Sequence, residues 1–198
     1  MVPVHGSADD AAESFPEPDP AAGARPHARV QARAERPAPM AAAWKAMQAG
    51  RLDAALALAE SALARAQTAR EPDLQAAALT VQAHVLRLRS RLAAAHRVAQ
   101  QAAAVYRDLH EHHGEAQALV QVAHAASSLG RTEEAVEAAL LAVKLLQAQP
   151  SPALLASAHN ALGAAYFWSG AHDRARAAFE TAIELAQCHG SASGVFQP

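Results

Sequence analysis

The chain has 198 residues, of which 52% are hydrophobic and only 4% aromatic, and its formal net charge is −2. This length and composition allow a sizeable core, while the charge gives no broad basic field of the kind that non-specific nucleic-acid binding needs. We therefore expect no nucleic-acid partner, and no apolar run is long enough to predict a membrane span.

The single cysteine and the amino terminus bear on the compartment. Cys188 cannot form an internal disulfide, and the first ten residues contain no basic segment followed by an apolar run. A lone cysteine suits a reducing environment, and this amino terminus is not typical of a secretory signal. The prediction is a cytoplasmic protein.

Residues 1–37 form a predicted Pro- and Ala-rich arm. Seven of the eleven prolines lie between Pro3 and Pro39, and large apolar side chains are scarce in this stretch. Such a segment cannot bury enough surface to offset its ordering entropy, so we predict disorder. Its acidic first half and basic second half are compatible with an interaction arm or with a disordered leader.

From residue 38 onward the sequence repeats itself. Similar segments begin at Gly50, Ser90, Gly130 and Gly170, which are 40 residues apart. Alanine or phenylalanine recurs at fixed offsets of five, nine and twelve after each of these residues, on one face of a helix. The columns are Ala55, Ala95, Ala135 and Ala175, then Ala59, Ala99, Ala139 and Phe179, then Ala62, Ala102, Ala142 and Ala182. Each of the four turn residues is thus predicted to open the second helix of a hairpin.

A first helix is predicted before each turn, at about 39–49, 73–89, 115–129 and 151–169. Small residues stand seven positions before three of the turns, at Ala83, Ala123 and Gly163, where a partner helix must come close. Proline and glycine punctuate the breaks between hairpins, the last at Gly190. We therefore predict repeats at about 38–71, 72–111, 112–151 and 152–190, within a domain of residues 38–190, followed by a flexible tail over 191–198.

The fourth repeat resembles the tetratricopeptide repeat family. The residues that carry this resemblance are Leu162, Gly163, Ala165, Tyr166, Phe167, Gly170, Ala175, Phe179 and Ala182. The resemblance implies an all-α fold, a right-handed α-α superhelix (solenoid) of four helix hairpins. A period of 40 instead of about 34 residues is similar to the long-period repeats of bacterial regulatory members of the family.

The resemblance also implies that the first helices line a concave groove. The positions that would face it hold Trp44, Met47, Thr80, His84, Arg87, His124, Asn160, Phe167 and Trp168. Aromatic anchors with spaced polar groups suit a protein or peptide partner. For Trp44 and Phe167 the alternative is that they only close the ends of the Ala-rich core. A clamp for the carboxy-terminal peptide of a chaperone is not predicted. Such a clamp uses paired Lys and Asn side chains, and these groove positions do not hold such pairs.

Histidines suggest two further hypotheses. His110 and His113 are predicted to share a helical face, which would allow a metal site, but the cluster also reads as the end of a helix before Gly114. We predict no metal and no cofactor, because no cysteine pair completes a ligand set. His84 and His124 would lie one above the other in the groove, and the alternatives are pH-dependent recognition near pH 6 to 7 or satisfied or solvated side chains without that role.

No catalytic motif is present, so we predict a non-enzymatic module that binds a protein or peptide. The alternative is a sensory or regulatory region of a larger bacterial signalling protein, a diguanylate cyclase or a transcriptional regulator. A metal-dependent enzyme is a third hypothesis. We expect no capping helix after Gly190. The apolar face of the last hairpin would then be covered by a partner, by a second copy in a homodimer, or by a continuation of the chain.

Overall fold

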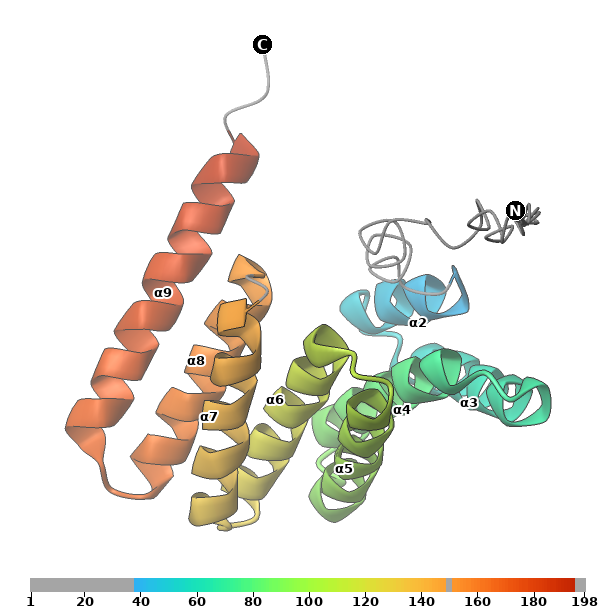
Figure 1. Cartoon of the computed structure of the whole chain (residues 1–198), viewed down its shortest axis with the longest axis horizontal. Coiled ribbons are helices and arrows are strands. Elements are labelled where there is room, and N and C mark those ends of the chain that lie inside the picture. Colours follow the sequence, from blue (N-terminus) through green and yellow to red (C-terminus); the bar gives the residue numbers. More distant parts are fainter. Residues whose placement is uncertain (1–37, 149–150, 195–198) are drawn as a thin grey trace, which may run out of the picture. The chain divides into compact units, whose positions relative to one another are not determined.

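The computed structural model describes residues 38–148 and 151–194, and these form eight α-helices that pair into four hairpins (Figure 1). Three parts of the chain lie outside the described residues. They are the predicted arm over residues 1–37, residues 149–150 near the predicted boundary between the third and fourth repeats, and residues 195–198. The helices are α2 (Ala38–Gln48), α3 (Leu52–Ala69), α4 (Pro72–Leu88), α5 (Leu92–Asp108), α6 (His112–Ser128), α7 (Thr132–Ala148), α8 (Pro152–Trp168) and α9 (His172–Gly194). The all-α prediction and the four hairpins are confirmed.

Residues with a left-handed backbone conformation follow the helix ends at a regular interval along the chain. Gly50, Gly130 and Gly170 have φ between 72° and 79°, and the same region is occupied by Arg70, Ser90 and His110 with φ between 54° and 58°. At Gly50, the amide of Arg51 donates to Ala46 O at 2.9 Å and the amide of Gly50 donates to Met47 O at 2.9 Å. This is the Schellman pattern, which satisfies the last carbonyls of a helix. Among the described residues these caps follow a 20-residue spacing, which is half of the repeat.

The histidine cluster begins a helix and does not end one, which corrects the prediction. Glu111 is the N-cap of α6, and its carboxylate accepts from the backbone amides of His113 at 3.2 Å and Gly114 at 2.6 Å. His110 precedes the helix in the left-handed region, so His110 and His113 do not share a helical face. The reason is that Glu111 satisfies the amides that the start of a helix leaves free.

The first helices form an inner layer. Helix α4 packs against α2 and α6, and α6 also packs against α8, whereas the backbones of the second helices approach only those of neighbouring first helices. The alanine columns predicted from the repeat lie in the core, with Ala55, Ala95 and Ala135 almost fully buried. Small side chains allow the helix axes to approach closely, which explains how a core so poor in aromatics closes. The superhelical arrangement follows from repeating this one contact.

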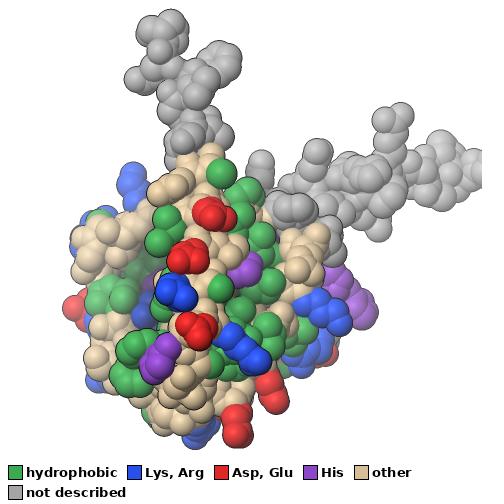
Figure 2. Space-filling model, turned by 90° about the vertical axis from the view of Figure 1, so that its left-hand side faces the viewer, with side chains coloured by type: hydrophobic (Ala, Val, Ile, Leu, Met, Phe, Trp, Pro, Cys, Tyr) green, Lys and Arg blue, Asp and Glu red, His purple; other side chains and the backbone are tan. Residues whose placement is uncertain are grey.

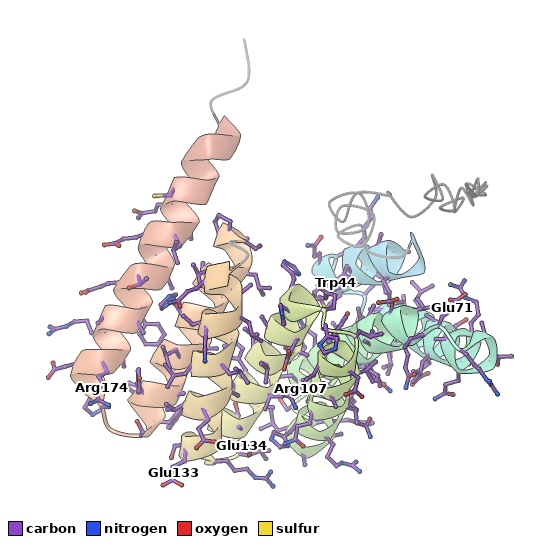
Figure 3. The ribbon with its side chains drawn as sticks, in the orientation of Figure 1. Trp44, Glu71, Arg107, Glu133, Glu134 and Arg174 are labelled. Carbon is purple, nitrogen blue, oxygen red and sulfur yellow. The ribbon has the colours of Figure 1, made fainter. Side chains whose placement is uncertain are left out.

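Polar side chains connect neighbouring hairpins, and two of these residues, Arg107 and Glu134, are labelled in Figure 3. Glu115 is buried, and Arg107 Nε donates to its Oε1 at 2.8 Å. His96, also buried, lies with its Nε2 2.7 Å from Oε1 of Glu134. Glu134 on α7 is therefore held by a residue of the preceding hairpin.

The last hairpin keeps an apolar face open in the described part of the chain. Ile183 on α9 is 56% exposed, whereas Val143, which occupies the same repeat position on α7, is 9% exposed. The difference arises because α8 packs against α7, and no described helix takes the equivalent place beside α9. Figure 2, which faces the left-hand side of Figure 1, shows hydrophobic side chains beside a row of charged ones. Helix α9 also continues to Gly194, four residues past the predicted break at Gly190.

Candidate functional site

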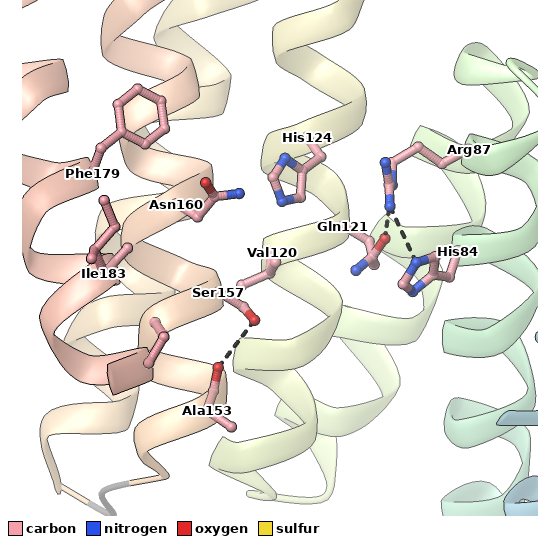
Figure 4. A pocket seen from close by; sticks show the side chains of 13 residues that line it. His84, Arg87, Val120, Gln121, His124, Ala153, Ser157, Asn160, Phe179 and Ile183 are labelled. Atoms are coloured by element: carbon pink, nitrogen blue, oxygen red, sulfur yellow. Dashed lines mark hydrogen bonds between the residues drawn. The ribbon is translucent and has the colours of Figure 1, made fainter. Parts of the chain in front are cut away.

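A groove of about 740 Å³ lies on the inner layer, where α4, α6 and α8 line it and α9 closes one side (Figure 4). The first helices supply most of the lining because the hairpins turn these helices inward. The lining residues are His84, Arg87, Val120, Gln121, His124, Ala153, Ala156, Ser157, Asn160, Phe179, Ala182, Ile183 and Ala186.

Arg87 forms the polar centre of the groove. Its Nε donates to Gln121 Oε1 at 3.2 Å, and its Nη2 lies 3.1 Å from His84 Nε2. A guanidinium can only donate, so His84 Nε2 accepts and its proton resides on Nδ1. That Nδ1 is buried without a hydrogen-bond partner among the described residues. Two elements, α4 and α6, therefore hold Arg87 in place.

The two groove histidines are neutral at physiological pH. Burial, followed by the charge of Arg87, lowers the pKa of His84 to about 4. Burial, Arg87 and His84 together lower the pKa of His124 to about 4 as well. Desolvation disfavours the charged imidazolium, and the nearby cation adds to this effect. A pH response of this pair near 6 to 7 is therefore contradicted by the structure.

Arg87 carries the only formal charge of the groove lining. None of the lining residues is Asp or Glu, and no described carboxylate forms an ion pair with this guanidinium. Burial lowers the pKa of Arg87 below its usual value, but an arginine stays protonated in proteins. The groove therefore contains a half-buried cation without a counter-charge in the described part of the chain.

Apolar side chains form the other end of the groove. Val120 on α6 and Phe179 and Ile183 on α9 border it, and Ala182 and Ala186 continue this wall along α9. Ser157 and Asn160 lie between this wall and His124, and Ser157 Oγ donates to Ala153 O at 3.1 Å. One surface can thus bind a charged group at the Arg87 end and bury an apolar side chain at the α9 end.

Four of the nine predicted groove residues line the site: His84, Arg87, His124 and Asn160. Trp44 is partly buried and meets the His84 ring edge-on, with centroids 5.6 Å apart and planes at 85°. It therefore borders the groove through His84 and packs against the core at the same time.

The other four predicted residues lie elsewhere. Met47 and Thr80 are only 8% and 2% exposed and belong to the core, which corrects their assignment to the groove surface. The Thr80 hydroxyl donates to Ala76 O at 2.9 Å, so this polar side chain is satisfied within its own helix. Phe167 and Trp168 are exposed at the end of α8, where they meet edge-on outside the groove lining.

Sequence reasoning missed Gln121, Phe179 and Ile183. It assigns the groove to first helices alone, but α9 contributes because no described helix covers it. A signal was present in the repeat columns, since Ile183 is a large apolar residue at the position of Val143, in the last hairpin that the structure describes. Gln121 is not among the predicted groove positions and is recognised only through its bond to Arg87.

Metal-binding groups and membrane-spanning helices are both absent from the described residues. These residues contain no group of three or more His, Cys, Asp or Glu side chains that could hold a metal ion. In the same part of the chain, every helix is too short or too polar to cross a bilayer.

The fold and the groove place the chain in the class of superhelical helical-repeat proteins. Comparisons with a family model and with solved structures show what it resembles within this class. The family model of the tetratricopeptide repeat matches residues 116–145 and 156–187. The two matched segments, in α6–α7 and α8–α9, are therefore similar to tetratricopeptide repeats. No curated protein matches this chain.

Solved structures show the same fold. The chain is similar to a crystal structure of the nearly identical TPR-like repeats of a Podosopora anserina putative kinesin light chain, with 18% identity and a TM-score of 0.58. That match covers 82% of this chain and 83% of the other. Another crystal structure of these repeats gives 18% identity and a TM-score of 0.55, covering 80% and 81% of the two chains. At such identities the likeness establishes the fold.

Proposed function

We propose that this protein is a non-catalytic module that binds a segment of another protein, or a peptide, in the groove formed by α4, α6, α8 and α9. The observation that carries this proposal is the lining itself, in which Arg87, a cation without a counter-charge among the described residues, and an exposed apolar wall at Ile183 share one concave surface. Peptide-binding grooves commonly combine an apolar surface that buries an anchor side chain with polar groups that fix the register of the peptide.

The described carboxylates support a binding role over a catalytic one. Buried Glu115 is paired with Arg107, and Glu134 with His96, so both serve contacts between helices. The groove itself holds no acid or nucleophile beside its histidines except the Ser157 hydroxyl, which donates to a backbone carbonyl. We also place the module in the cytoplasm, because a single cysteine suits a reducing compartment.

A displayed library of random peptides tests this function. Selection against the intact chain would be followed by measuring each enriched peptide against Asn160→Trp, which fills the groove from an exposed position. The matched control is Gln147→Trp, an exposed and uncharged position on α7 outside the lining. We expect Asn160→Trp to abolish binding and Gln147→Trp to preserve it.

Phe167→Ala provides a second control, because Phe167 is exposed but lies outside the groove lining. Binding is expected to survive this change. Peptides that bind Asn160→Trp as well as the unaltered chain would show that the groove is not the binding surface, and the proposal would then be abandoned.

A further inference from the structure

The groove shows a specific chemistry for its occupant. Resting on the proposed function, we propose that the bound segment places an internal Asp or Glu side chain on Arg87 and an aliphatic side chain on the wall formed by Phe179, Ile183 and Ala186.

The charge balance of the groove favours a carboxylate. Arg87 is half-buried, and Gln121 and His84 use one donor direction each, so further N–H groups of the guanidinium remain for a ligand. An arginine fork matches a carboxylate in a bidentate pair. Burying this cation without a counter-charge is costly, and a ligand anion removes that cost.

A single negative charge fits better than a phosphate. His84 and His124 are neutral at pH 7, so they add no positive charge to that of Arg87. A phosphate would bring close to two negative charges, and its recognition sites use clusters of arginines. One cation with neutral neighbours is therefore complementary to one carboxylate.

The position of Arg87 within the inner layer favours a side chain over a chain terminus. Helix α4 has α2 on one side and α6 on the other, so Arg87 is not at the end of the layer. A segment that crosses the layer from the Trp44 side to α9 passes Arg87 with its interior. Its carboxylate is then an acidic side chain, and its carboxyl terminus lies elsewhere.

The distance across the layer sets the spacing of the two anchors. Packed helices lie about 8–10 Å apart, so α4 and α8 are separated by roughly 20 Å. An extended segment covers this with about six residues at roughly 3.3 Å each. A helical segment needs about 13 residues at roughly 1.5 Å each. The aliphatic wall lies on α9, which packs beside α8, so these two separations are the minimum expected between the acidic and aliphatic anchors.

A double-mutant cycle tests the pairing. Peptides of about 20 residues, which span roughly 30 Å even when helical, are selected on the intact chain and made with amidated carboxyl termini. Their affinities are measured by fluorescence polarisation for the unaltered chain and for Arg87→Gln, before and after the acidic residue of the peptide is changed to Gln. Arg97→Gln, an exposed position on α5 outside the groove, is the charge-matched control.

We expect either single change to weaken binding roughly ten- to a hundredfold, the effect of losing a charge-assisted pair. The two changes together should weaken it no further than one alone, and Arg97→Gln should leave it within about twofold. Arg87→Lys should recover part of the loss, since it keeps the charge without the fork. Melting curves check that the variants stay folded.

Three results would overturn the inference. Peptides that are blocked by Asn160→Trp but bind Arg87→Gln undiminished would remove the pairing and leave the proposed function intact. Selected peptides that bind only with a free carboxyl terminus would show that the carboxylate is terminal. A library without any peptide that Asn160→Trp blocks would overturn the proposed function, and this inference with it.

Discussion

Gly163 on α8 lies directly against the ring of Phe179 on α9: a Cβ atom at residue 163 would approach two ring carbons to 2.7 Å. This close approach sets how tightly the last hairpin packs. It also holds Phe179 in the wall of the groove.

Gly163→Ala is expected to destabilise the protein. Overpacking costs about 1–3 kcal/mol, which exceeds the gain of roughly 1 kcal/mol in helix propensity on replacing glycine. Urea unfolding should show a lower midpoint with an unchanged slope. Adding Phe179→Leu should restore part of the loss, because the smaller side chain makes room. A Gly163→Ala protein as stable as the original would mean that the ring moves aside freely.

Ala135 marks the contact between neighbouring hairpins. It is fully buried, so Ala135→Leu should force the helices apart at a cost of about 1–3 kcal/mol. Ala93→Leu, at an exposed position on α5, is the control and should change the free energy of unfolding by less than about 0.5 kcal/mol. Thermal melting followed by circular dichroism compares the two. Equal melting temperatures would show that the core has space at this position.

Arg107 compensates the buried carboxylate of Glu115. Arg107→Met should destabilise the protein by about 1–3 kcal/mol at pH 7, because it leaves that carboxylate without its hydrogen-bond donor. Adding Glu115→Gln removes the buried charge and should recover part of the stability, which chemical denaturation can measure. If the double variant is less stable than Arg107→Met alone, the charge of Glu115 is satisfied by another group.

The neutral histidines of the groove make stability depend on pH. His84 and His124 have pKa values of about 4 in the folded protein, against 6.5 for the unfolded reference. The unfolded chain therefore binds more protons below pH 6.5, so their contribution is present above that pH and is lost progressively as the pH falls towards 4.

The double variant His84→Gln with His124→Gln isolates this effect. Between about pH 7 and pH 5 the unaltered protein should lose more stability than the variant, as judged by urea midpoints at each pH. This interval lies largely above the titration of ordinary carboxylates, which removes their contribution. Parallel loss in both proteins would show that the two histidines titrate normally in the folded state.

Much of the fold could be predicted because the repeat is local information. Gly50, Gly130 and Gly170 mark turns whose left-handed backbone favours glycine, and the alanine columns follow from helical periodicity. Arg70 and His110 occupy the same backbone region without glycine and are not among the predicted turn residues, so their caps leave no clear trace in the sequence. For that reason the sequence pattern assigns His110–His113 to the end of a helix instead of the start of the next.

The candidate site could be predicted only in part. His84, Arg87, His124 and Asn160 are found because one helical face repeats, but Met47 and Thr80 share that face and are buried. Their burial depends on how far each first helix rotates against its neighbours, which no single helix encodes. The arm over residues 1–37, the peptide partner, and the bacterial regulatory subtype stay predictions.

The sequence alone thus determined the number of hairpins, their turns and the small residues at which helices meet, since each depends on neighbours within a few turns of helix. Only the tertiary structure decided that Arg87 is held by Gln121 from the next repeat and faces no carboxylate among the described residues. It also decided that α9 lends Phe179 and Ile183 to the groove. These features depend on side chains that are far apart in the chain, and only the packing of successive hairpins brings them together.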